Sequence, residues 1–83
     1  MPESTAQLYP GPQYPGPLSV VAQHALASSG VYPLRELTVE PHNDGLLISG
    51  AVSSFYLKQL AQEVVMAATG SVDLVNSVRV TET

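Results

Sequence analysis

The stretch that decides the fold is NDGLLISGAVSSFYLKQLAQEVV, which runs from Asn43 to Val65. It opens with Asn, Asp and Gly, residue types that tight turns favour, and continues into an apolar run suited to a strand. Ser53 and Ser54 then precede a segment with helical spacing. A serine at this place can accept a hydrogen bond from the first turn of a helix. The stretch therefore predicts a turn, a strand and a capped helix in succession.

The predicted helix covers residues 55–69 and is amphipathic. Its apolar stripe consists of Leu57, Leu60, Ala61, Val64 and Ala68, which recur at the spacing of one helical face. The other side carries Lys58, Gln59, Gln62 and Glu63. Gly70 supplies a stop signal. We expect Lys58 to be solvated and to keep the helix soluble.

A β-hairpin is predicted on the N-terminal side of this helix. Residues 34–41 alternate between apolar and polar side chains, as a half-buried strand requires. Asn43 to Gly45 form the turn, and residues 46–52 return as the second strand. Its inward side chains are expected to be Leu46, Ile48 and Val52. Gly50 inside this strand indicates a bulge or the close approach of a helix.

Two further elements complete the predicted fold. Residues 72–80 alternate, with Val72, Leu74, Asn76, Val78 and Val80 on one face. Residues 18–29 have helical spacing, with Gln23 on the polar side and Gly30 as the expected cap. The order αββαβ predicts an α+β fold with two helices packed on one face of a three-stranded sheet. The second and third strands should be parallel because a helix connects them; the strand order stays open.

The first part of the chain has a different composition. Residues 1–17 hold five of the seven prolines and the sequence YPGP twice. Such segments favour polyproline-like or disordered chain, so we expect a Pro/Gly-rich leader followed by one domain over residues 18–83. Pro12 to Pro15 also fits a bare P-x-x-P motif, which leaves docking on an aromatic-lined groove as an alternative.

Composition and charge limit the classes of function. The 83 residues include three Lys or Arg, seven Asp or Glu and no Cys, with a net charge of −4. Little cationic surface is available for a phosphate backbone, so nucleic acid is not an expected partner. Neither a secretory signal nor a transmembrane segment is visible in the sequence, and the expected default location is the cytoplasm.

Catalytic and metal sites find weak support. A serine nucleophile needs a positioned base, and Ser54 and Lys58 lie four residues apart on one predicted helix. A capping serine is already engaged with the backbone, however. His42 and Asp44 supply two potential metal ligands in a turn, too few for a tetrahedral site. We therefore expect no catalytic residues, no metal site and no cofactor.

The uncovered face of the predicted sheet is a candidate contact surface. It would show Thr38, Glu40, Leu47, Ser49, Ala51, Val75, Ser77 and Arg79. Apolar groups on such a face indicate an interaction site or a homo-oligomer. The candidate contact residues are Leu47 on this face and the aromatic pair Phe55 and Tyr56 at the start of the predicted helix.

One family shares this order of motifs. The segments LTVEPHNDGLLISGAVSSFYLKQLAQEVV and VNSVRV, within residues 18–80, resemble a BON domain, a family named for bacterial osmotic-stress and nodulation proteins. The matching positions are Val39, Gly45, Ile48, Ser49, Gly50, Val52, Lys58, Val75, Asn76, Val78 and Val80. The turn glycine stands one residue closer to Gly50 than the family pattern has it, and Ser71 separates Gly70 from Val72.

The resemblance implies a non-enzymatic αββαβ module. BON domains are thought to bind phospholipid surfaces or proteins, often in the cell envelope, and they share no catalytic residues. The lack of basic residues on the first predicted helix weakens the lipid role. A protein partner or self-association is then comparably expected, with a structural, oligomer-forming accessory domain as the alternative.

Overall fold

The computed structural model describes residues 17–70 and 72–81. The predicted leader and its YPGP repeats lie almost entirely outside the described residues. Helix α1 (Leu18–Ala27) is followed by a 3-10 helix η1 (Tyr32–Glu36) and the strands β1 (Thr38–His42), β2 (Gly45–Ser49) and β3 (Ala51–Val52). Helix α2 (Phe55–Thr69) then leads to β4 (Leu74–Asn76) and β5 (Arg79–Val80). The predicted α+β order is confirmed, with η1 as an addition.

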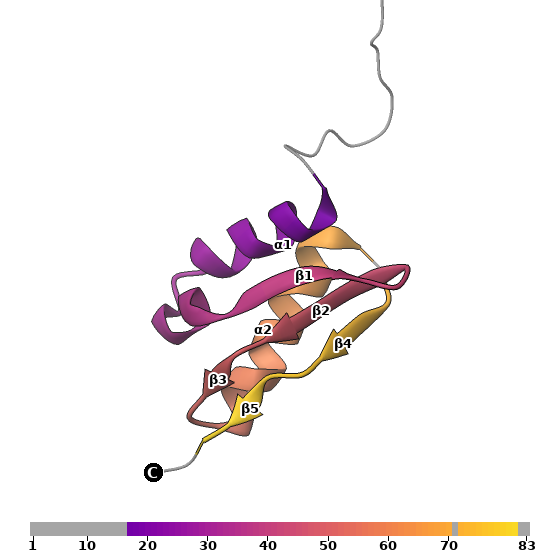
Figure 1. The fold of residues 1–83 in the computed structure, drawn as a ribbon. Coiled ribbons are helices and arrows are strands. Elements are labelled where there is room, and N and C mark those ends of the chain that lie inside the picture. Colours follow the sequence, from indigo (N-terminus) through magenta and orange to yellow (C-terminus); the bar gives the residue numbers. More distant parts are fainter. Residues whose placement is uncertain (1–16, 71, 82–83) are drawn as a thin grey trace, which may run out of the picture.

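The three-stranded sheet has the order β1-β2-β4, so β2 is its central strand. β1 and β2 form the predicted antiparallel hairpin, in which Val39 lies opposite Ile48. β4 runs parallel to β2, as expected for strands joined through a helix. β3 follows β2 and β5 follows β4 along the chain, and β3 and β5 pair in parallel as a separate two-stranded sheet. In Figure 1, α2 lies behind the strands and α1 runs beside β1.

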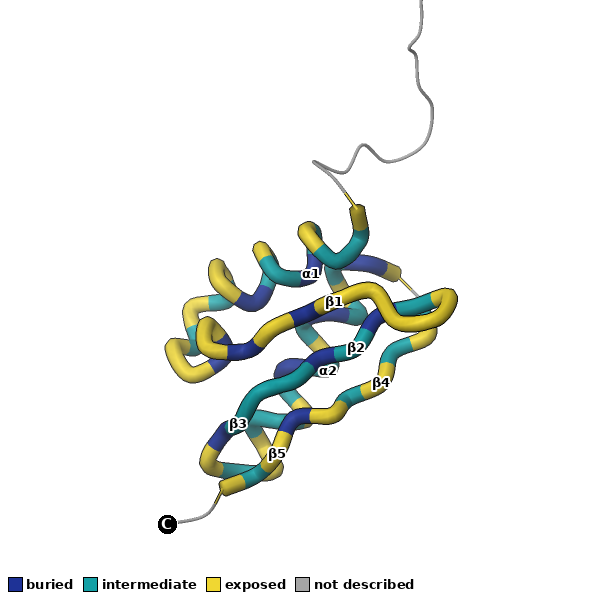
Figure 2. The backbone as a smooth tube through the Cα atoms, viewed as in Figure 1, coloured by how far each residue is buried: buried dark blue, intermediate teal, exposed yellow. Residues whose placement is uncertain are grey.

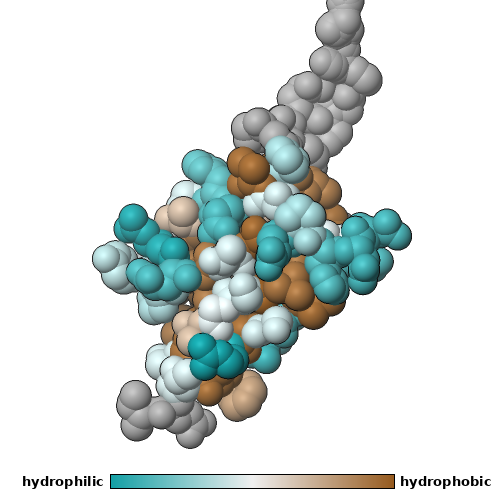
Figure 3. All heavy atoms as spheres, in the orientation of Figure 1, coloured by the Kyte–Doolittle hydropathy of each residue, from teal (hydrophilic) through white to brown (hydrophobic). Residues whose placement is uncertain are grey.

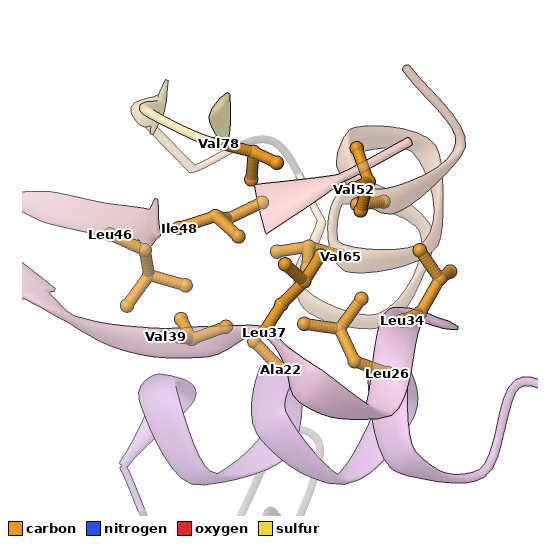
Figure 4. Close-up of a cluster of buried hydrophobic side chains, with 11 residues drawn as sticks. Ala22, Leu26, Leu34, Leu37, Val39, Leu46, Ile48, Val52, Val65 and Val78 are labelled. Carbon is orange, nitrogen blue, oxygen red and sulfur yellow. The ribbon is translucent and has the colours of Figure 1, made fainter. Parts of the chain in front are cut away.

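The core lies between the sheet and the two helices. Its buried hydrophobic residues are Ala22, Leu26, Leu34, Leu37, Val39, Leu46, Ile48, Val52, Ala61, Val65 and Val78. Figure 4 shows these side chains pointing toward one another from the strands, η1 and the helices. Both helices thus cover the same face of the sheet, which leaves the opposite face uncovered.

The predicted first strand began too early. Leu34 to Glu36 belong to η1, and β1 starts only at Thr38. Pro33 suits the first turn of a helix because it has no N–H to leave unpaired. The N–H of Leu37 donates to the carbonyl of Leu34 at 3.2 Å, which closes the short turn. Leu34 consequently enters the core from η1.

Glycines explain why the later strands differ from the prediction. Gly50 has a φ of +127° and separates β2 from β3. Gly50 lies in close contact with Leu37, because the Cδ2 of Leu37 would lie 2.8 Å from a Cβ added to Gly50. Gly45 is part of β2 and not of the turn, where Asn43 carries the positive φ of 53°. A Cβ on Gly45 would collide with the carbonyl oxygen of Asp73.

Helix α2 has the predicted bounds and cap. The N–H of Leu57 donates to the Ser54 Oγ at 3.2 Å, as expected of an N-cap serine. Val65 was missing from the predicted stripe, although it is fully buried. The prediction for Lys58 was also wrong in part, because its side chain is half-buried and not fully solvated.

Candidate functional site

The predicted contact residues occupy two separate places. Leu47 lies on the uncovered face of β2, between Glu40 of β1 and Val75 of β4, and it is half-buried. Phe55 and Tyr56 begin α2 and are 69% and 71% exposed. Figure 3 shows apolar surface between polar side chains on the face that carries the sheet. Leu47 therefore belongs to the sheet face, and the aromatic pair to the start of α2.

Phe55 borders a hollow between α2 and β5. The hollow has a volume of about 500 Å³ and is lined by Phe55, Lys58, Ser77, Val78, Arg79, Val80 and Thr81. Two of the chain's three basic residues, Lys58 and Arg79, are among its lining residues, and none of the lining residues that the structure describes is a carboxylate. Leu47 does not contribute to this lining. We call this region the α2–β5 hollow.

The outer edge of β1 is closed to another strand. The Gln23 side-chain amide donates to the carbonyl of Leu37 at 2.7 Å and accepts from the N–H of Val39 at 2.8 Å. Pro41, the next residue whose nitrogen faces outward, has no N–H. Gln23 therefore takes the place that a neighbouring strand would take, and Pro41 offers no donor beyond it.

The edge formed by β4 and β5 is open by comparison. The N–H groups of Ser77, Arg79 and Thr81 donate to carbonyls of the β2–β3 segment at 2.8 to 2.9 Å. Since alternate residues of a strand point their backbone groups in opposite directions, the N–H groups of Asn76 and Val80 face outward. Neither has a hydrogen-bond partner within residues 17–70 and 72–81. Figure 2 shows exposed and less exposed positions alternating along this edge.

Asn76 connects this edge to α2. Its side-chain nitrogen donates to the carbonyl of Lys58 at 2.9 Å and to the Gln62 Oε1 at 3.3 Å. Its side-chain oxygen accepts the N–H of Val78 at 3.2 Å. These hydrogen bonds hold α2 beside β4. They thereby keep together the two walls of the α2–β5 hollow.

The residues considered for catalysis are engaged otherwise or stand apart. Ser54 Oγ accepts the capping hydrogen bond from Leu57. His42 and Asp44, the two potential metal ligands, lie exposed at the hairpin. The described part of the chain contains no group of three or more His, Cys, Asp and Glu residues that could hold a metal ion. Within residues 17–70 and 72–81, Ser54 and these side chains are therefore not brought together as a nucleophile and a base.

Several residues important at these edges were not identified from the sequence. Gln23 stood on the polar side of its helix, and its bonds to β1 cross 14 and 16 residues of chain. Asn76 was placed on the inward face, but its partners on α2 were not predicted. A polar residue at an inward strand position signals that a buried partner must exist, because buried polar groups are hydrogen-bonded. That signal could have singled out Asn76.

Comparison with protein-family models, with curated proteins and with solved structures gives no match for this chain. Among the described residues, no helix is both long enough and apolar enough to cross a membrane.

Proposed function

We propose that this chain is a non-enzymatic binding module of the kind that the BON resemblance implies, associating with an envelope protein or a phospholipid surface. The observation that carries the proposal is the apolar surface that the core does not use. Phe55 and Tyr56 remain more than two-thirds exposed, and Val75 is 45% exposed beside the half-buried Leu47. Single exposed apolar residues are ordinary, but adjacent ones next to an open strand edge indicate contact.

A protein partner is favoured over a phospholipid surface. Each Lys or Arg near an anionic membrane contributes about 1 kcal/mol, and the α2–β5 hollow has only two such residues in its lining, Lys58 and Arg79. The outward backbone groups of β4 and β5 also need hydrogen-bond partners, which hydrocarbon lacks and a polypeptide has.

Self-assembly is the second candidate function. Leu47 and Val75 are neighbours in register on the uncovered sheet face, and a second copy could cover them. In that case the chain would act as a structural, oligomer-forming accessory domain without another ligand.

Solution mass and vesicle flotation together separate these functions. The binding-module proposal expects a monomer over a wide concentration range and no flotation with neutral vesicles. A stable dimer that Leu47→Glu converts into a folded monomer would replace it with the oligomer function. Flotation with anionic vesicles that salt abolishes would identify the phospholipid version. Glu63→Gln, an exposed change on α2, serves as the control that should alter neither measurement.

A further inference from the structure

We infer that the β4–β5 edge binds an extended acidic peptide segment of a partner protein, which adds a strand beside β5 and places carboxylates in the α2–β5 hollow. This inference rests on the proposed function and specifies the chemistry of the partner. Extended peptides bind exposed sheet edges through main-chain hydrogen bonds, while neighbouring pockets select their side chains.

The backbone determines which edge can accept a strand. At β1, Gln23 already bonds to Val39 and Leu37, and Pro41 has no donor. At β5, the N–H of Val80 faces outward without a partner among the described residues. A strand added to the three-stranded sheet or its β3–β5 continuation would therefore join on the β5 side.

The charge of the hollow determines which peptide fits. Lys58 of α2 and Arg79 of β5 both line the hollow, and no carboxylate is found among the lining residues in the described part of the chain. The hydrogen bonds between described residues do not engage the side-chain nitrogens of these two cations. The carboxylates of an acidic peptide would thus meet two basic residues, Lys58 on α2 and Arg79 on β5, whereas a basic peptide would be repelled.

Phe55 gives the hollow an apolar wall. It lies three residues before Lys58 on α2 and is 69% exposed. An aliphatic side chain of the added peptide can cover this ring while its flanking carboxylates remain near the cations. A second copy of the chain is disfavoured at this place, since pairing β5 with itself would bring two sets of Lys58 and Arg79 together.

The hollow on the other side of the molecule does not fit the same ligand. It is lined by Ser19, Val20, Gln23, His24, Ala27 and Val39 and has no Lys or Arg. Gln23 also occupies the adjacent backbone groups of β1. This second hollow therefore serves as an internal control in the binding experiment described below.

The test uses the full chain and blocked peptides in which glutamate alternates with valine. Binding is measured by titration, and the position of the peptide by amide NMR shifts and hydrogen exchange. We expect protection to increase at Asn76 and Val80 and not at Val39. The same peptide with lysine in place of glutamate should bind about tenfold more weakly or worse. N-methylation of one alternate set of peptide nitrogens should abolish binding, and methylation of the other set should not.

Charge variants of the chain complete the test. Lys58→Ala combined with Arg79→Ala should weaken acidic-peptide binding about tenfold. Arg35→Ala is the matched control, because this third basic residue stacks 5.2 Å from the Tyr32 ring on η1. Equal binding of acidic and basic peptides, protection at β1, or no binding by a correctly folded monomer would overturn the inference. If a correctly folded monomer binds no peptide, the binding-module proposal still stands. If the β4–β5 edge is protected by self-association without peptide, both the inference and the binding-module proposal are overturned. Binding of anionic vesicles with the same amide shifts would assign the edge to lipid instead.

Discussion

The two outer edges of the sheet meet the same physical requirement in opposite ways. At β1 a helix side chain, Gln23, pairs with the outward backbone, and Pro41 removes the next donor. At β4 and β5 the corresponding amide, Asn76, turns inward to α2 and leaves part of the edge unpaired. Natural sheets usually protect their edges against further pairing. The difference identifies one edge as structural and the other as available for contact.

The largest effect is expected where the open edge is attached to the hairpin. Gly45→Ala would place a Cβ against the carbonyl oxygen of Asp73, just before β4. Because that oxygen also accepts the N–H of Leu46 at 2.8 Å, the strand cannot easily move away. We expect a loss of about 3 kcal/mol of unfolding free energy, measured by urea denaturation.

Gly30→Ala is the control for this change. Gly30, unlike Gly45, has a positive φ of +84°, and no atom among the described residues lies within 4 Å of an added Cβ. It should lose only about 1 to 2 kcal/mol from backbone strain. If both variants lose the same unfolding free energy, close packing against Asp73 does not explain why residue 45 is a glycine.

The next effect tests the closed edge. Gln23→Ala removes both hydrogen bonds to β1 and leaves the N–H of Val39 without its protein partner. We expect a loss of about 2 kcal/mol and faster hydrogen exchange of the Val39 amide. Gln59→Ala is the matched control, because Gln59 is exposed and its side chain, among the described residues, bonds to Glu63 of its own helix alone. Unchanged exchange at Val39 would contradict the role assigned to Gln23.

A smaller effect is expected at the start of α2, where the aromatic pair and the hollow meet. Ser54→Ala removes the side-chain oxygen that accepts the N–H of Leu57 and should cost about 1 kcal/mol. Ser53→Ala, at an exposed neighbouring position, should change the stability by less than about 0.5 kcal/mol. A larger loss at Ser53 than at Ser54 in thermal or urea unfolding would contradict this assignment of the cap.

The fold could be predicted from local signals wherever one element carried a complete pattern. The bounds of α2 followed from a serine cap, an apolar stripe and Gly70, all within one stretch. η1 was missed because a short 3-10 turn has no period of its own, and Leu34 fits a strand alternation equally well. The division at Gly50 depends on its contact with Leu37, which the sequence does not specify.

The candidate site was less accessible to prediction, because packing and not periodicity creates it. Exposed Phe55 and Tyr56 and outward Leu47 could be selected from helix and strand phase. Helix phase also placed Lys58 in solvent, whereas the passage of β5 beside α2 makes it part of a hollow. Gln23 acts through contacts with β1 that tertiary structure alone defines.

The smallest change in stability is expected at Pro41, yet it tests the comparison of the edges most directly. Pro41 is exposed, and its nitrogen faces away from β2, so Pro41→Thr removes no sheet hydrogen bond. The unfolding free energy should change by less than about 0.5 kcal/mol. The variant should remain as monomeric as the parent chain, because Gln23 still covers Val39.

Combining Pro41→Thr with Gln23→Ala should expose two consecutive outward donors, at residues 39 and 41. A row of unpaired backbone groups is a template for strand pairing, so this double variant should associate at concentrations where each single variant is monomeric. Light scattering measures the mass, and hydrogen exchange should locate the new contact at β1. If the double variant is stable and monomeric at the highest concentrations, an amide and a proline are not what closes this edge. Association that instead protects Asn76 and Val80 would mean that the β5 side governs self-pairing even when β1 is uncovered.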